Sequence, residues 1–155
     1  MLDGETDITD QILGCAIEVH RYLGPGLPES SYESALCIEF GLRGLSFKRQ
    51  VGVPVYYKGE LIAEHRPDLI VEGRVIVEVK AIERFAPVHV SQVLTYLRVT
   101  SLSVGLLLNF NCPTIQAGTR RVVLRTQRSP RLRASAARGL SEVLETDFDA
   151  DLDLA

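Results

Sequence analysis

Residues 66–80 read Arg-Pro-Asp-Leu-Ile-Val-Glu-Gly-Arg-Val-Ile-Val-Glu-Val-Lys, and this stretch decides the fold. Two short apolar runs flank Glu72-Gly73-Arg74, a spacing that is typical of a β-hairpin with a three-residue loop. A loop of that length pairs Val71 with Val75. The stretch therefore predicts two adjacent antiparallel strands in the core of the protein.

The same register places Asp68 directly opposite Glu78. Because side chains alternate along a strand, these two acids share a face with Ile70, Ile76 and Lys80. The opposite face carries only leucine and valine, as a buried face should. Two carboxylates and an ammonium on the other face of a core hairpin need a physical reason.

One reason is a metal ion. Two neighbouring carboxylates repel each other, and ionising both is costly unless a cation lies between them. Mg²⁺ binds a few carboxylate oxygens and keeps several waters, and Lys80 beside it can orient or deprotonate a bound water. The alternative is a solvated face with an ordinary Glu-Lys pair, since Glu-x-Lys is a common pattern.

Length and composition limit the classes of protein to which this chain can belong. A chain of 155 residues is long enough for one well-packed domain, and no apolar run approaches the roughly 20 residues that a membrane helix needs. The acidic start lacks the pattern of a secretion signal. Cys15, Cys37 and Cys112 are widely spaced, which indicates neither a zinc site nor disulfides and favours a cytoplasmic protein.

The charge is unevenly distributed. Residues 12–125 carry 13 Lys and Arg against 10 Asp and Glu, whereas the whole chain has a net charge of −3. A mildly basic core is compatible with a phosphate-bearing partner. We expect one folded domain over residues 1–125 and a charged, flexible tail over residues 126–155.

Hydrophobic periodicity predicts an α/β protein. The predicted helices cover residues 7–23, capped by Thr6 or Asp7, then 28–40 and 87–99. The predicted strands cover residues 46–51, 53–57, 61–63, the two arms of the hairpin, 104–108 as a buried central strand, and 122–125 as an edge strand.

Further motifs support a family resemblance. Gly26-Leu27-Pro28-Glu29-Ser30-Ser31-Tyr32 fits the signature of the GxxExxY protein family. Pro67-Asp68 followed by Glu78-Val79-Lys80 resembles the PD-(D/E)xK nuclease pattern in full, and Gln92-Val93-Leu94-Thr95-Tyr96 is similar to the Gln-x-x-x-Tyr element of one branch of that superfamily. The resemblance spans about residues 8–125 and implies a PD-(D/E)xK nuclease-like core of order α-β-β-β-α-β, a central mixed sheet flanked by helices.

The resemblance also implies roles for single residues. Asp68, Glu78 and the Val79 carbonyl are the expected ligands of Mg²⁺ or Mn²⁺, with Lys80 positioning or activating the attacking water. Glu29 is expected to reach this metal cluster, although an acid in the first turn of a helix is also explained by the helix dipole.

Other residues are expected at the periphery of the site. Gln92 and Tyr96 lie four residues apart on one helical face, and the resemblance implies that they orient the lysine or contact substrate. Tyr32 is a candidate for substrate binding, against a place in the core, and Arg66 for a phosphate contact, against plain solvated surface. His20, His65 and His89 have no metal-ligand spacing.

These observations lead to a first hypothesis, a divalent-metal-dependent nuclease acting on DNA. The alternative is a non-catalytic nucleic-acid-binding module or subunit with a nuclease-like fold, and a purely protein-binding scaffold has the least support. A double-strand cut needs two active sites, so a homodimer is compatible with the first hypothesis, although the sequence marks no interface.

Overall fold

The structure, a computed structural model, describes residues 3–125, so the predicted tail over 126–155 lies outside the described residues. Three helices are present in this range: α1 (Asp3–Leu23), α2 (Glu29–Leu42) and α3 (Pro87–Thr100). The strands are β1 (Phe47–Arg49), β2 (Val53–Tyr57), β3 (Glu60–His65), β4 (Leu69–Val71), β5 (Val75–Lys80), β6 (Val104–Asn109) and β7 (Thr119–Val123).

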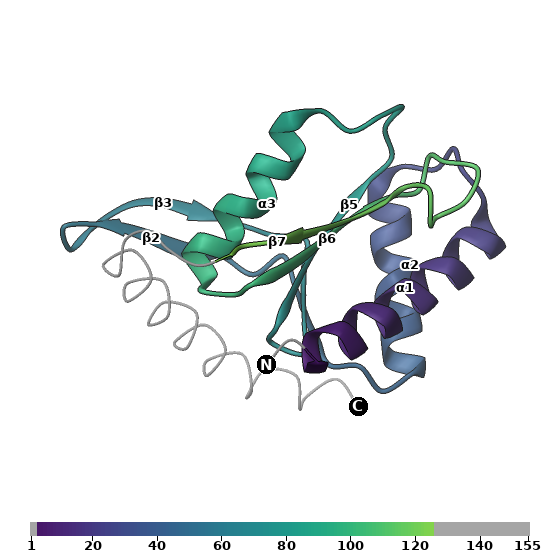
Figure 1. Cartoon of the computed structure of the whole chain (residues 1–155), viewed down its shortest axis with the longest axis horizontal. Helices are drawn as coiled ribbons and strands as arrows, with labels where there is room; N and C mark the ends of the chain where they lie inside the picture. The colour runs from purple at the N-terminus through teal and green to yellow at the C-terminus, as the bar shows by residue number, and fades with distance from the viewer. Residues whose placement is uncertain (1–2, 126–155) are drawn as a thin grey trace.

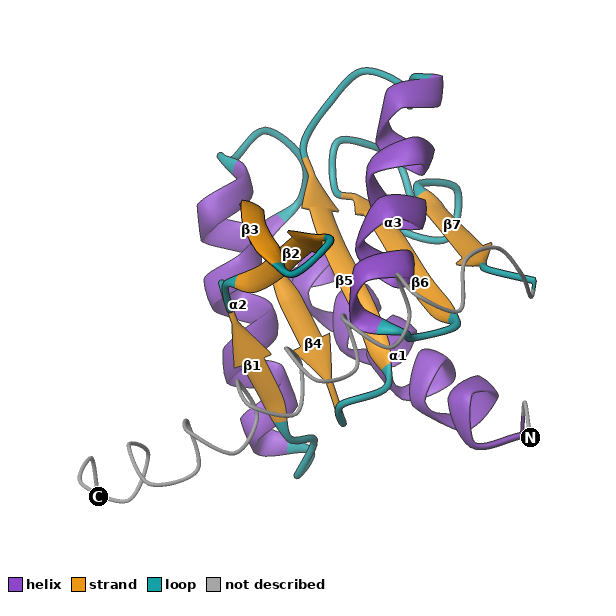
Figure 2. Cartoon of the chain, turned by 90° about the vertical axis from the view of Figure 1, so that its left-hand side faces the viewer, coloured by secondary structure: helices purple, strands orange, loops and turns teal. Residues whose placement is uncertain are grey.

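A five-stranded mixed sheet forms the centre, in the order β1-β4-β5-β6-β7. Strands β5 and β6 are parallel, because α3 connects them as a crossover, and the other neighbours are antiparallel. Helices α1 and α2 lie on one face of the sheet and α3 on the other (Figures 1 and 2). The predicted α/β class with a helix-flanked mixed sheet is confirmed.

The hairpin of β4 and β5 has the predicted register, with Val71 opposite Val75 and Leu69 opposite Val77. Its leucine and valine face packs against α1 and α2 in the larger core cluster. The opposite face is buried as well, because Ile70 and Ile76 pack under α3. The acids of this hairpin therefore lie beside a second apolar core.

The hairpin of β2 and β3 does not join the central sheet. It forms a separate two-stranded sheet that extends away from the body of the protein (Figure 1). The base of this hairpin is anchored on α3, where Val53 packs with Val99. The predicted turn at Lys58-Gly59 is confirmed, and both of its residues have positive φ angles, as such tight hairpin turns require.

The ends of several elements differ from the sequence-based expectation. Helix α1 already includes Asp3, the first described residue, so Thr6 and Asp7 lie inside the helix. Helix α2 runs through Gly41 to Leu42 before the chain turns. Within residues 3–125, no helix combines the length and the apolar character that crossing a membrane requires.

Candidate functional site

The two acids of the hairpin meet at the end of the β4–β5 ladder. The backbone N–H of Asp68 donates a hydrogen bond to Glu78 Oε1 at 2.8 Å, and the N–H of Val79 donates to Asp68 Oδ2 at 2.9 Å. Each carboxylate is thus held by the backbone of the other strand. The register that the three-residue loop imposes is what brings the two side chains together.

Burial makes this pair unusual. Only 3% of Glu78 is exposed to solvent. Desolvation by this burial, followed by the negative charge of Asp68, raises the pKa of Glu78 to about 8. The carboxyl group of Glu78 therefore holds a proton at neutral pH unless a cation compensates its charge.

The oxygen donors at this point fit a hard divalent cation. The N–H of Val79 donates to Asp68 Oδ2, so the backbone of this residue lies against the acid pair. No group of three or more His, Cys, Asp or Glu side chains in residues 3–125 is arranged to hold a metal ion. A complete shell would combine the two carboxylates and the backbone oxygen with water, as Mg²⁺ prefers.

Lys80 is the last residue of β5, and its side chain contacts α3. Its Nζ lies 4.0 Å from Glu78 Oε2 and donates to Gln92 Oε1 at 3.4 Å. Gln92 Nε2 in turn donates to the Tyr96 hydroxyl oxygen at 2.9 Å. Burial, followed by the charge that Glu78 carries when it is ionised, raises the pKa of Tyr96. The structure thus brings the expected Gln-x-x-x-Tyr pair next to the lysine.

Glu29, the first residue of α2, lies slightly apart from the acid pair. Its side chain is exposed, and its Oε1 accepts a hydrogen bond from the N–H of Ala81 at 3.4 Å. Ala81 directly follows Lys80. The contact places Glu29 at the end of β5, against the backbone that directly follows the lysine.

Tyr32 has a different environment from the one expected of a substrate-binding residue. It is fully buried, and its ring stacks on Phe110 with centroids 4.4 Å apart. The hydroxyl donates to the Gly24 carbonyl at 2.5 Å and accepts from the N–H of Leu27 at 3.1 Å. As a correction, Tyr32 anchors the loop before α2 from within the core, where substrate does not reach it.

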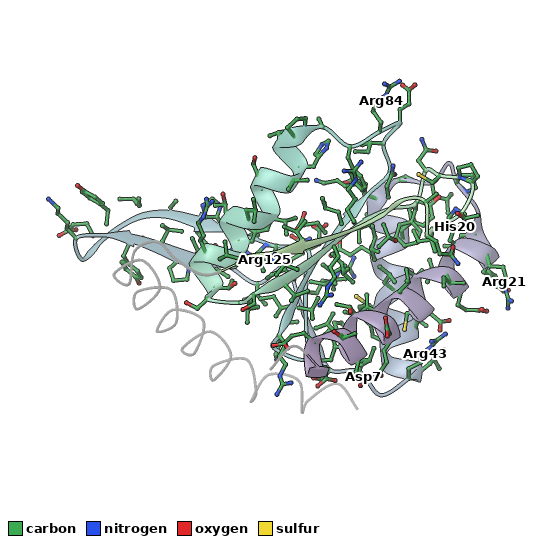
Figure 3. The ribbon with its side chains drawn as sticks, viewed as in Figure 1. Asp7, His20, Arg21, Arg43, Arg84 and Arg125 are labelled. Atoms are coloured by element: carbon green, nitrogen blue, oxygen red, sulfur yellow. The ribbon has the colours of Figure 1, made fainter. Side chains whose placement is uncertain are left out.

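Arg66 lies at the rim of the site, and its side chain is largely exposed. Its guanidinium contacts Glu64 Oε1 at 2.6 Å and donates to the Gln50 carbonyl at 3.1 Å. Arg84, in the loop between β5 and α3, points away from the body of the protein (Figure 3). Arg66 is the basic residue nearest to Asp68 in the sequence, two positions before it.

Sequence reasoning missed Gln50, which the fold brings to Asp68, and Glu33, which Gln50 connects to it. Gln50 Nε2 donates to Asp68 Oδ1 at 3.0 Å and to Glu33 Oε1 at 3.1 Å. Glu33 is buried in α2. Arg49 of β1 forms an ion pair with it, with 3.0 Å between Arg49 Nε and Glu33 Oε1. The available signal for Glu33 was its position one helical turn after Glu29; no sequence signal marked Gln50.

Asn109 was also missed, and it supports the other end of the site. This residue ends β6, is almost fully buried, and lies in register with Lys80. Its side chain accepts from the N–H of Ile82 at 3.1 Å and donates to the Ile82 carbonyl at 2.8 Å. Asn109 thereby fixes the chain directly after Lys80.

The histidines have structural contacts. His20 Nε2 lies 2.8 Å from the Cys112 carbonyl, at the end of α1 (Figure 3). His89 Nδ1 accepts from the N–H of Ala86 at 2.9 Å, at the start of α3. The ring of His65 packs on the edge of Tyr96, with centroids 5.8 Å apart.

Residues 6–122 match the family model described as the PD-(D/E)XK nuclease superfamily. The chain belongs to this superfamily, whose members typically are metal-dependent phosphodiesterases. Searches of curated proteins and of solved structures returned no match.

Proposed function

We propose that this protein is a nuclease that requires Mg²⁺ or Mn²⁺ and hydrolyses phosphodiester bonds, with DNA as its expected substrate. The observation that carries the proposal is the buried pair of Asp68 and Glu78 beside Lys80, in a chain of the PD-(D/E)XK superfamily. Within that superfamily we assign the chain to the GxxExxY family, on the sequence of residues 26–32.

Asp68, Glu78 and the Val79 carbonyl are the residues that would hold the cation. The fit rests on the donor chemistry and on a buried carboxyl whose pKa of about 8 shows the energetic cost of ionising it alone. When bound, such an ion acts as a Lewis acid that stabilises the negative charge developing on the phosphate.

Lys80 is the candidate for orienting the water that attacks phosphorus. Its side chain is mostly buried, and the contact with Gln92 limits its rotamers. Tyr96 holds Gln92 in turn, so these two residues of α3 position the lysine. Arg66 at the rim supplies a guanidinium for a backbone phosphate, and Glu29 is a candidate to complete the acid cluster from α2.

A cleavage assay tests the proposal. Labelled duplex, single-stranded and branched DNA are incubated with Mg²⁺, Mn²⁺ or chelator, using the wild type, Asp68→Asn and Lys80→Met. We expect metal-dependent cutting by the wild type and a loss of about 10²-fold or more in either variant. Glu60→Gln, a similar change on the exposed β2–β3 hairpin, serves as the control. Wild-type cutting by Asp68→Asn or Lys80→Met would refute the assignment.

A second candidate, a non-catalytic nucleic-acid-binding module, is favoured by the net positive charge of residues 12–125. This function predicts DNA binding that weakens steeply with salt and is indifferent to metal and to Asp68→Asn. Binding measured by fluorescence anisotropy in chelator, at several salt concentrations, separates the two candidates. Metal-dependent cutting that Asp68→Asn removes would exclude the second.

A further inference from the structure

Gln50 has a backbone conformation that a glutamine rarely adopts. It follows β1 with a φ angle of +53°, in the left-handed region. For a residue with a Cβ this conformation is strained, and it persists where the surrounding structure enforces it. The contacts of Gln50 identify what enforces it here.

Three hydrogen bonds connect Gln50 to the segment that carries Asp68. The N–H of Gln50 donates to the Asp68 carbonyl at 2.9 Å, and its own carbonyl accepts from Arg66 Nη1 at 3.1 Å. Its side-chain nitrogen donates to Asp68 Oδ1 at 3.0 Å. Backbone and side chain of one residue thus hold the same short segment.

The same side-chain nitrogen also separates two acids. Its second contact, with Glu33 Oε1 at 3.1 Å, places an amide donor between the carboxylates of Glu33 and Asp68. An amide nitrogen carries two hydrogens, so one group can serve both acceptors. Glu33 is buried and is also paired with Arg49, which keeps it on the α2 side of the amide.

The consequence for Asp68 is a single orientation of its carboxylate. Gln50, directly after β1, donates to Oδ1, and the N–H of Val79 in β5 donates to Oδ2. A carboxylate has about four acceptor positions, so both oxygens retain capacity for a cation. Groups that orient metal ligands in this way typically contribute 10–100-fold to metal affinity.

We propose that Gln50 is a positioning residue of the metal site: its side-chain amide fixes the Asp68 carboxylate for ligation and keeps Glu33 apart from it. This inference rests on the proposed function, because it assumes that Asp68 binds a divalent cation. It adds a residue from the turn directly after β1 to a site otherwise built from β5, α3 and the segment before β4.

The test is a calorimetric titration of the full chain with Mn²⁺, using the wild type, Gln50→Gly, Asp68→Ala and Lys58→Gly. Glycine adopts positive φ without strain, so Gln50→Gly removes the amide while keeping the backbone turn. Lys58→Gly is the matched control, since Lys58 also has a positive φ, of 49°, in the exposed β2–β3 turn. Urea unfolding of each variant verifies that it is folded.

We expect Gln50→Gly to bind Mn²⁺ about 10–100-fold more weakly than the wild type, and Lys58→Gly to bind like the wild type. Wild-type affinity in Gln50→Gly, with loss of binding in Asp68→Ala, would overturn the role of Gln50 and leave the metal site standing. An equal loss in Lys58→Gly would also overturn it, by showing a general backbone effect. Absent binding in the wild type would refute the proposed function itself, and this inference with it.

Discussion

The buried carboxyl of Glu78 makes the stability of the metal-free protein depend on pH in a predictable direction. The folded pKa is about 8 against an ordinary value of 4.5. Between these pH values the folded protein binds a proton that the unfolded chain has released, so the free energy of unfolding falls as pH rises. Within this window each pH unit lowers the free energy of unfolding by about 1.4 kcal/mol, which sums to about 5 kcal/mol from pH 4.5 to pH 8.

Replacing Glu78 by glutamine removes the titrating group and keeps an oxygen to accept from the Asp68 N–H. We expect Glu78→Gln, in chelator, to be more stable than the wild type by about 3 kcal/mol at pH 7 and about 5 kcal/mol at pH 9. Below pH 4.5 the two proteins should differ little, because Glu78 is then protonated in both the folded and the unfolded state.

Urea unfolding followed by circular dichroism, at pH 5, 7 and 9 in chelator, measures these differences. Glu60→Gln on the exposed hairpin is the matched control and should follow the wild type at every pH. Saturating Mg²⁺ should stabilise the wild type, by about 2.7 kcal/mol at one hundred times its Kd, and should leave Glu78→Gln unchanged. Wild-type and Glu78→Gln stabilities that run parallel from pH 5 to 9 would refute the reasoning.

Three further substitutions have defined outcomes. Lys80→Met should reduce cleavage by about 10²–10⁴-fold while Mn²⁺ binding by calorimetry persists; lost binding would instead make the lysine structural. Gly105→Ala should destabilise the fold by about 1–3 kcal/mol in urea unfolding, because the new Cβ would lie 2.5 Å from Val93 Cγ1; an unchanged midpoint would contradict the close packing of α3. Tyr32→Phe should lower the free energy of unfolding by about 1–2 kcal/mol, because two hydrogen bonds are lost, and should leave KM unchanged. A raised KM would instead indicate that Tyr32 contacts substrate.

The central hairpin could be predicted because its information is local. A three-residue loop and strict alternation fix the register, and the register alone places Asp68 opposite Glu78. Gln92 and Tyr96 were predictable for a similar reason, since helical spacing puts them on one face. Their contact with Lys80 then follows from α3 packing on the sheet.

The features that could not be predicted depend on contacts between segments that are distant in the sequence. Gln50 reaches Asp68 because its backbone turns into the left-handed region, and an isolated glutamine carries no sequence signal for that turn. Tyr32 fits both a helix face near the site and a core position, and only the stack on Phe110 decides between them. Strand patterns likewise do not reveal that β2 and β3 leave the main sheet.

The central claim is that Asp68 and Glu78 hold a divalent cation. Calorimetric titration with Mn²⁺ at pH 7, in two buffers of different ionisation enthalpy, tests it most directly, because it reports both metal binding and proton release. The account predicts saturable binding with release of close to one proton, since the pKa of Glu78 is about 8, and loss of both in Asp68→Ala. Absent binding, or binding that Asp68→Ala leaves intact, would contradict it.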